Sequence, residues 1–188
     1  MAIIKKTVLL LVISVFAAKV QAATLLTDAN LDQFEALLPK LQQLQQRPQN
    51  SQFNLQQHCN WSQHYTTLSA QETDSDYRLA IERIAGQHGF TPVQFIELSA
   101  KLSWPVLDSV QGALEVSRQA LLFLPAQQRQ STERKLIKGQ QYYKTLTSCL
   151  TADDKTALAK HHNRIMQIAK RLGGVEQLLP GNFALPGQ

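Results

Sequence analysis

Cys59 and Cys149 are the two cysteines of this 188-residue sequence and its most reactive side chains. An even number of cysteines in a protein exported to an oxidising compartment favours a disulfide over free thiols. The sequence therefore predicts a Cys59–Cys149 bridge, provided that the chain is exported. The alternative is two separate buried thiols.

Five histidines raise the question of metal binding or catalysis. His161 and His162 are adjacent, so on one helix they would point about 100° apart and would not hold one metal together. His58 and His64 are six residues apart and do not share a helix face. Zinc needs three or four converging ligands, and a site including Cys59 would compete with the disulfide. We predict no metal and no cofactor; the alternative is a metal-dependent or other enzyme that uses His161 or His162 with residues distant in sequence.

Other catalytic signatures are absent from the sequence. There is no Gly-x-Ser-x-Gly motif, no His-Glu-x-x-His motif, no glycine-rich phosphate loop and no Cys-x-x-Cys-His haem attachment motif. Asp153 and Asp154 are neighbours in a plausible helix cap, so we interpret them as capping or solvated acids. The sequence thus leans away from an enzyme and towards a binding protein.

Aromatic residues are the best candidates for contacting a partner. Trp104 and Tyr142 would anchor a partner if they were exposed. Trp104 precedes Pro105 at an expected helix junction, where a groove between helices would receive a peptide or an acyl chain. The alternative is that Trp104 and Tyr143 fill the core.

The first 22 residues resemble a cleavable secretory signal peptide. Lys5 and Lys6 precede a twelve-residue apolar run, and small residues at Val20 and Ala22 predict cleavage after Ala22. The run is shorter than the roughly 20 apolar residues of a membrane-spanning helix, although an uncleaved anchor is the alternative. We expect a mature protein in the periplasm, or outside the cell as the alternative.

Removal of the signal peptide changes the charge balance. The sequence has 19 Lys and Arg and 14 Asp and Glu, and three of the lysines lie within residues 1–22. The mature chain therefore has 16 basic and 14 acidic residues, a net charge of +2. This balance favours neither nucleic acid nor an anionic membrane surface as a partner. No later segment reaches membrane-spanning length, so we expect a soluble mature protein whose partner is a protein, peptide or lipid of the cell envelope.

Apolar residues recur every three or four positions along the mature chain, which predicts helices. The pattern indicates an all-α fold: an irregular bundle of five or six helices forming one domain over residues 23–188, with an irregular tail from about residue 175. Thr91 to Gln94 predicts a helix start, Gly89 a left-handed helix end, and Pro39 and Pro105 kinks or breaks. His162 is expected on the inner face of the last helix, and the other histidines in solvent. The predicted core consists of Phe34, Leu38, Ile81, Ile84, Ile96, Val110, Leu114, Leu121, Ile165 and Leu172.

Two segments carry a resemblance to known proteins. Residues 26–34, running into Leu37-Leu38-Pro39, look like the opening of a loose group of small secreted bacterial all-helical proteins of unknown function. Gly89-Phe90-Thr91-Pro92, followed by Phe95, resembles the His-Gly-Phe start of the central helix in that group. The resemblance implies an exported helical fold and assigns no functional residues. We therefore expect an exported helical protein that binds a protein or an envelope component in the periplasm without catalysing a reaction.

Overall fold

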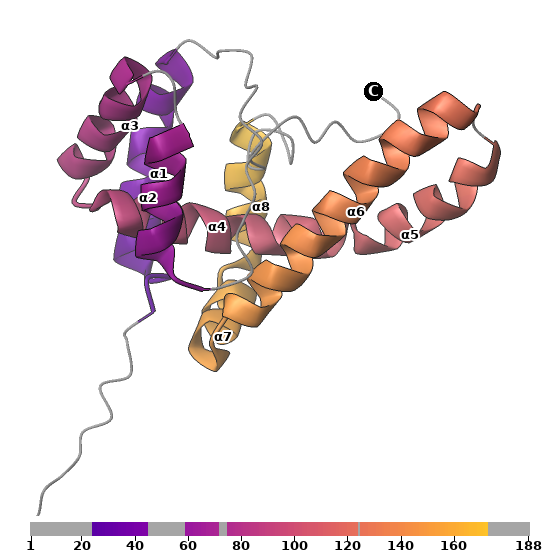
Figure 1. Cartoon of the computed structure of the whole chain (residues 1–188). Helices are drawn as coiled ribbons and strands as arrows, with labels where there is room; N and C mark the ends of the chain where they lie inside the picture. Colours follow the sequence, from indigo (N-terminus) through magenta and orange to yellow (C-terminus); the bar gives the residue numbers. More distant parts are fainter. Residues whose placement is uncertain (1–23, 45–58, 72–74, 124, 173–188) are drawn as a thin grey trace, which may run out of the picture.

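The structure is all-α, as predicted. The computed structural model describes residues 24–44, 59–71, 75–123 and 125–172, and these ranges contain helices and no strand (Figure 1). The helices are α1 (Asp28–Gln43), α2 (Trp61–Gln71), α3 (Ser75–Gln87), α4 (Pro92–Ser109), α5 (Gln111–Ala120), the 3-10 helix η1 (Leu121–Phe123), α6 (Ala126–Cys149), α7 (Ala152–Lys160) and α8 (His162–Arg171). The predicted signal peptide, its cleavage site after Ala22 and the tail from residue 175 lie outside the described ranges.

Local signals in the sequence set the helix boundaries. Thr91 caps α4 by accepting a hydrogen bond from the backbone N–H of Gln94, whose side chain accepts from the Thr91 N–H in return. Thr151 and Asp154 make the same reciprocal pair at the start of α7. Gly89 has φ +82°, the left-handed conformation that a glycine adopts without strain. The predicted cap at Thr91 and the predicted turn at Gly89 are confirmed.

The described residues form eight α-helices, more than the predicted five or six, because the breaks fall at unexpected places. Pro39 lies inside α1 and Pro105 inside α4, so neither proline divides its helix. The chain leaves helical geometry at Val110 (φ −96°, ψ −2°) and at His161 (φ −98°, ψ 10°). These residues divide segments that the sequence pattern presents as continuous.

α4 is the central helix of the fold: it packs most extensively against α2, α6 and α8 and also contacts α3, α5 and α7 (Figure 1). The main core gathers around it, and Phe95 of α4 stacks on Phe34 of α1 with ring centroids 6.0 Å apart. The buried members of the main core are Leu26, Leu31, Phe34, Leu37, Leu38, Ala85, Phe90, Leu98, Leu102, Leu150, Leu158, Ile165 and Ile168.

A smaller cluster joins α6 to α4. Its buried residues are Ala100 and Leu107 from α4 and Leu146 from α6. Beyond this attachment, α5, η1 and α6 form a helical hairpin that projects from the rest of the molecule (Figure 1), and we call this hairpin, residues 111–149, the arm. The 24 residues of α6 correspond to a length of about 36 Å.

The predicted core is correct only in part. Phe34, Leu38 and Ile165 are buried in the main core, and Leu121 is buried in the arm. Ile84 and Leu172 pack against the main core while half-buried. Ile81, Ile96, Val110 and Leu114 are also only half-buried. Leu114 fails as a core residue because α5 belongs to the arm, where the helix has few neighbours and buries none of its residues.

The predicted disulfide is present. Cys59, just before α2, is bonded to Cys149 at the end of α6, with alpha carbons 5.2 Å apart, within the usual range of about 4.4 to 6.8 Å. The bond lies where α6 meets the body of the molecule, so it ties the base of the arm to the segment that leads into α2.

Candidate functional site

A buried ion pair joins α4 to α7. The Lys101 ammonium lies 3.0 Å from both carboxylate oxygens of Asp154 and 2.7 Å from Oε1 of Glu97. The side chains of Lys101 and Asp154 are only 6 % and 1 % exposed. Thr24 also donates a hydrogen bond to Asp154 Oδ1, at 2.8 Å. Asp154 is therefore more than the capping or solvated acid that the sequence suggested.

Its surroundings keep Asp154 ionised. Burial alone would raise the pKa of this carboxyl group, because a charge loses hydration inside a protein. Hydrogen bonds from the Thr151 backbone, Lys101 and Thr24, together with the positive charge of Lys101, outweigh burial, and the pKa of Asp154 lies below its usual value. The carboxylates of Asp154 and Glu97 both contact the Lys101 ammonium. Because Lys101 belongs to α4 and Asp154 to α7, this ion pair holds α7 on α4, and we call it the clamp.

Lys101 was not among the residues predicted to be functional, although its position on an apolar helix face is visible in the sequence. Leu98, Lys101, Leu102 and Pro105 follow each other at intervals of three, one and three, which places them on one side of a helix. The other three are apolar and buried. A lysine on an apolar face indicates either a long side chain reaching solvent or a buried ion pair.

His161, one of the two histidines of the enzyme alternative, is buried beside a surface hollow of about 430 Å³. The hollow is lined by residues of α1 and its cap, α7 and the residues on either side: Leu26, Thr27, Asp28, Asp153, Thr156, Ala157, Lys160 and His161. Nδ1 of His161 lies 3.5 Å from Oδ1 of Asp28, whose other oxygen accepts a 2.9 Å hydrogen bond from Lys160. Lys160 and His161 thus face the two oxygens of the same carboxylate.

Two expectations about the histidines are wrong. His162 was expected on the inner face of the last helix, yet it is exposed and His161 is buried instead. The expectation assumed one continuous helix through this segment. The break at His161 separates α7 from α8, so the residues after it face other directions than in a continuous helix. His64 was expected in solvent but is buried against Trp61, with ring centroids 5.5 Å apart. Among the residues that the structure describes, no group of three or more His, Cys, Asp or Glu side chains converges as a metal site would require.

The two predicted partner-binding aromatics lie where the arm joins α4. Trp104 is half-buried, and its indole N–H donates a 2.9 Å hydrogen bond to the Thr147 hydroxyl of α6. Its ring stacks on Tyr143 at a centroid distance of 6.3 Å. Tyr142 is half-buried against the α4–α6 cluster, and its hydroxyl lies 3.4 Å from that of Ser103. Both residues therefore hold the arm on the body, and their binding of a partner stays a prediction.

The end of the arm carries the most exposed large apolar side chains of the described residues. Leu122 is 71 % exposed and Phe123 is 89 % exposed, whereas the preceding Leu121 is 7 % exposed. η1 places them this way because a 3-10 helix has three residues per turn, so only one of three consecutive side chains faces α6. We call Leu122 and Phe123 the tip.

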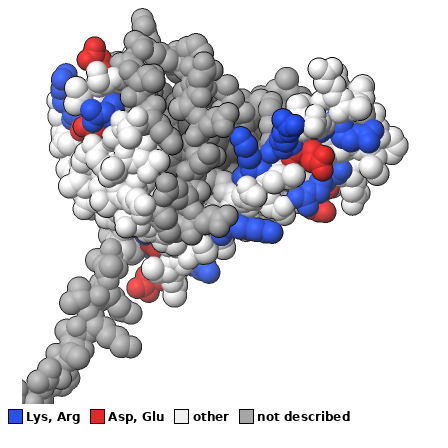
Figure 2. Space-filling view, viewed as in Figure 1, with Lys and Arg blue, Asp and Glu red and all other residues white. Residues whose placement is uncertain are grey.

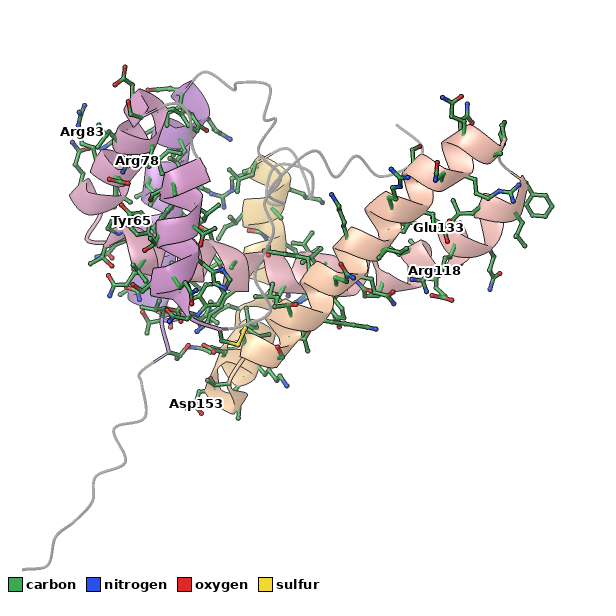
Figure 3. All side chains as sticks on the ribbon, viewed as in Figure 1. Tyr65, Arg78, Arg83, Arg118, Glu133 and Asp153 are labelled. Atoms are coloured by element: carbon green, nitrogen blue, oxygen red, sulfur yellow. A yellow bond between two sulfur atoms is a disulfide. The ribbon has the colours of Figure 1, made fainter. Side chains whose placement is uncertain are left out.

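Most of the exposed large hydrophobic residues that the structure describes lie in the arm, as the tip does. Of the five exposed large hydrophobic residues described, Val116, Leu122, Phe123 and Ile137 lie in the arm, and only Leu79 lies elsewhere. Arg129, near the start of α6, donates a 3.4 Å hydrogen bond to the Leu122 carbonyl. Arg118 of α5 bonds Gln140 of α6 and so joins the two helices behind the tip (Figure 3).

The tip was not predicted from the sequence, where only Leu121 was assigned a position, as a core residue. The available signal was the unbroken apolar run of residues 121–124, because one helix cannot bury four consecutive side chains against a single neighbour. Which members of the run stay exposed depends on the 3-10 turn.

No protein family matches this chain, and no curated protein and no solved structure is significantly similar to it. The candidate site therefore rests on the chemistry and exposure of its own residues.

Proposed function

We propose that this protein is an exported, non-enzymatic binding protein of the periplasm that engages an envelope component through the tip of its arm. The observation that carries the proposal is the exposure of Leu122 and Phe123 at the end of a projecting helical hairpin. Neither side chain fills the core. Large apolar groups gathered on a surface are typical of an interaction site.

The construction of the arm supports this use. The α4–α6 cluster, the Trp104–Thr147 hydrogen bond and the Cys59–Cys149 disulfide all lie at its base. The half of the arm farther from α4 has little buried surface, because α5 buries no residue and residues 126–131 are exposed. The base of the hairpin is therefore held on the body, and its far end is left accessible to a partner.

Binding of the purified mature protein to isolated cell envelopes tests the proposal. We expect saturable binding that the double substitution Leu122→Ser with Phe123→Ser weakens about tenfold or more, since each buried side chain of this size contributes about 1.5 to 3 kcal/mol. The matched control is Leu79→Ser, which removes a 46 % exposed leucine from α3, far from the arm. Equal binding by the double variant and the control would refute the role of the tip.

A further inference from the structure

The charge of the mature chain is unevenly distributed. Residues 111–149 contain six Lys and Arg and two Asp and Glu, a net charge of +4. The rest of the mature chain, residues 23–110 and 150–188, contains ten Lys and Arg and twelve Asp and Glu, a net charge of −2. The small overall charge is therefore the sum of a basic arm and an acidic remainder of the mature chain, which we call the body. Figure 2 shows Lys and Arg side chains gathered over the arm on the face in view.

Much of this positive charge is in no ion pair with another residue of the described ranges. Arg134, Lys138 and Lys144 lie exposed along α6, and none of them has a carboxylate partner among the residues the structure describes. Of the described arm cations, Arg118 is in an ion pair with an arm residue, lying 3.6 Å from Glu115. On the body, Lys101, Lys160, Arg164 and Arg171 are held by carboxylates. Arg83, Lys155 and Lys170 are exposed there without an ion pair to any described residue, but the acids of that region outnumber its cations.

From the coincidence of the apolar tip and the unneutralised cations, we propose that the partner of the arm is the surface of an anionic phospholipid bilayer. This inference rests on the proposed function and names its partner. The tip enters the boundary between headgroups and acyl chains, while Arg134, Lys138 and Lys144 lie against lipid phosphates. Peripheral membrane binding characteristically combines apolar insertion with basic attraction to anionic lipids.

The arrangement favours a bilayer over a protein groove. Two adjacent apolar side chains at a convex end give little area for a protein interface, which typically buries about 800 Å² on each partner. A fluid bilayer instead accepts a small convex wedge, and its phosphates are available to cations spread along α6. No helix of the described residues is long and apolar enough to cross a membrane, and surface docking requires none.

Flotation with lipid vesicles tests the inference. The disulfide-bonded mature protein is mixed with vesicles of phosphatidylcholine alone or of phosphatidylcholine with phosphatidylglycerol. We expect binding to the anionic vesicles only, largely lost near 1 M NaCl, where the Debye length falls to about 3 Å. Absence of binding to anionic vesicles, or equal binding to both kinds, would overturn the inference.

Two variants and their matched controls separate the tip from the cations. Leu122→Ser with Phe123→Ser should weaken vesicle binding about tenfold or more, and Leu79→Ser should leave it unchanged. The triple arm variant Arg134→Gln, Lys138→Gln and Lys144→Gln should weaken binding about 10- to 100-fold. Its control carries the same net charge through three exposed body cations, as Arg83→Gln, Lys155→Gln and Lys170→Gln.

Equal weakening by the two triple variants would reduce the effect to total charge and overturn the role of the arm. The envelope-binding assay distinguishes the two levels of the account. If envelopes bind the protein through the tip but protease-treated envelopes and anionic vesicles do not, the bilayer inference fails and the proposed function stands. If neither envelopes nor vesicles are bound through the tip, both fail.

Discussion

Replacing Asp154 by asparagine is expected to lower the free energy of unfolding by about 3 kcal/mol at neutral pH. The substitution removes the negative charge that faces Lys101 but keeps the size of the side chain. Lys101, only 6 % exposed, then loses one of its two carboxylate partners. Breaking a buried ion pair by removing one partner typically costs about 3 to 5 kcal/mol.

The lower end of that range applies here for two reasons. Glu97 remains 2.7 Å from the Lys101 ammonium and still compensates part of its charge. The amide oxygen of asparagine can also still accept one of the hydrogen bonds that now come from Thr24, Lys101 and the Thr151 backbone. Urea unfolding followed by circular dichroism measures the difference.

The cost should also depend on pH. Because the pKa of Asp154 is lower in the folded protein than its usual value, the carboxylate contributes stability above the unfolded-state pKa of about 3.9. That contribution is lost as the pH falls through the folded-state pKa. The difference in unfolding free energy between the wild type and Asp154→Asn should therefore begin to shrink as the pH falls below about 4, and it should disappear below the folded-state pKa.

Asp153→Asn is the matched control, since Asp153 is the exposed neighbour in the same first turn of α7 (Figure 3). Asp153→Asn should lower the free energy of unfolding by less than about 1 kcal/mol, because Asp153 contributes only an interaction with the helix dipole. A loss below about 1 kcal/mol for Asp154→Asn, or a difference that does not shrink in acid, would refute the clamp between α4 and α7.

Three further predictions concern stability and processing. Thiol labelling of the denatured, unreduced protein should detect no free cysteine, and replacing Cys59 and Cys149 by serine should cost about 2 to 4 kcal/mol; two labelled thiols would refute the bridge. Leu146→Ala, at a position with 0 % exposure, should cost about 2 to 5 kcal/mol, whereas half-buried Leu114→Ala should cost about 1 kcal/mol; equal losses would contradict the assignment of α5 to a thin arm. Intact-mass analysis of the periplasmic fraction should show a chain starting at Ala23, and recovery of the uncut chain in membranes alone would contradict cleavage.

Periodicity and capping residues predicted the helical class, the start of α4 and the turn at Gly89, because these depend on residues close together in sequence. The predicted pairing of Cys59 with Cys149 is also present, while the export on which that prediction was based stays a prediction. The breaks at Val110 and His161 were not predictable in the same way. Neither residue disfavours a helix strongly, so tertiary packing decides where the chain turns.

The errors in the predicted core and in the histidines follow from those breaks. A shift of helical phase at His161 exchanges the exposures of His161 and His162, and the turn at Val110 directs α5 away from the body, so that Leu114 lacks neighbours. The candidate site was missed for a related reason. A net charge of +2 argued against an anionic surface, but an average over the whole chain does not show how charges are distributed between an arm and a body.

Site-specific photo-crosslinking in living cells tests the central claim most directly. A photoreactive phenylalanine analogue at Phe123 lies within reach of whatever the tip binds, and the same analogue at Leu79 reports on an exposed apolar position of α3. We expect adducts with an envelope component from position 123 that position 79 does not give, and these adducts contain phospholipid if the partner is the bilayer. Absence of adducts from position 123, or the same adducts from both positions, would contradict binding through the tip.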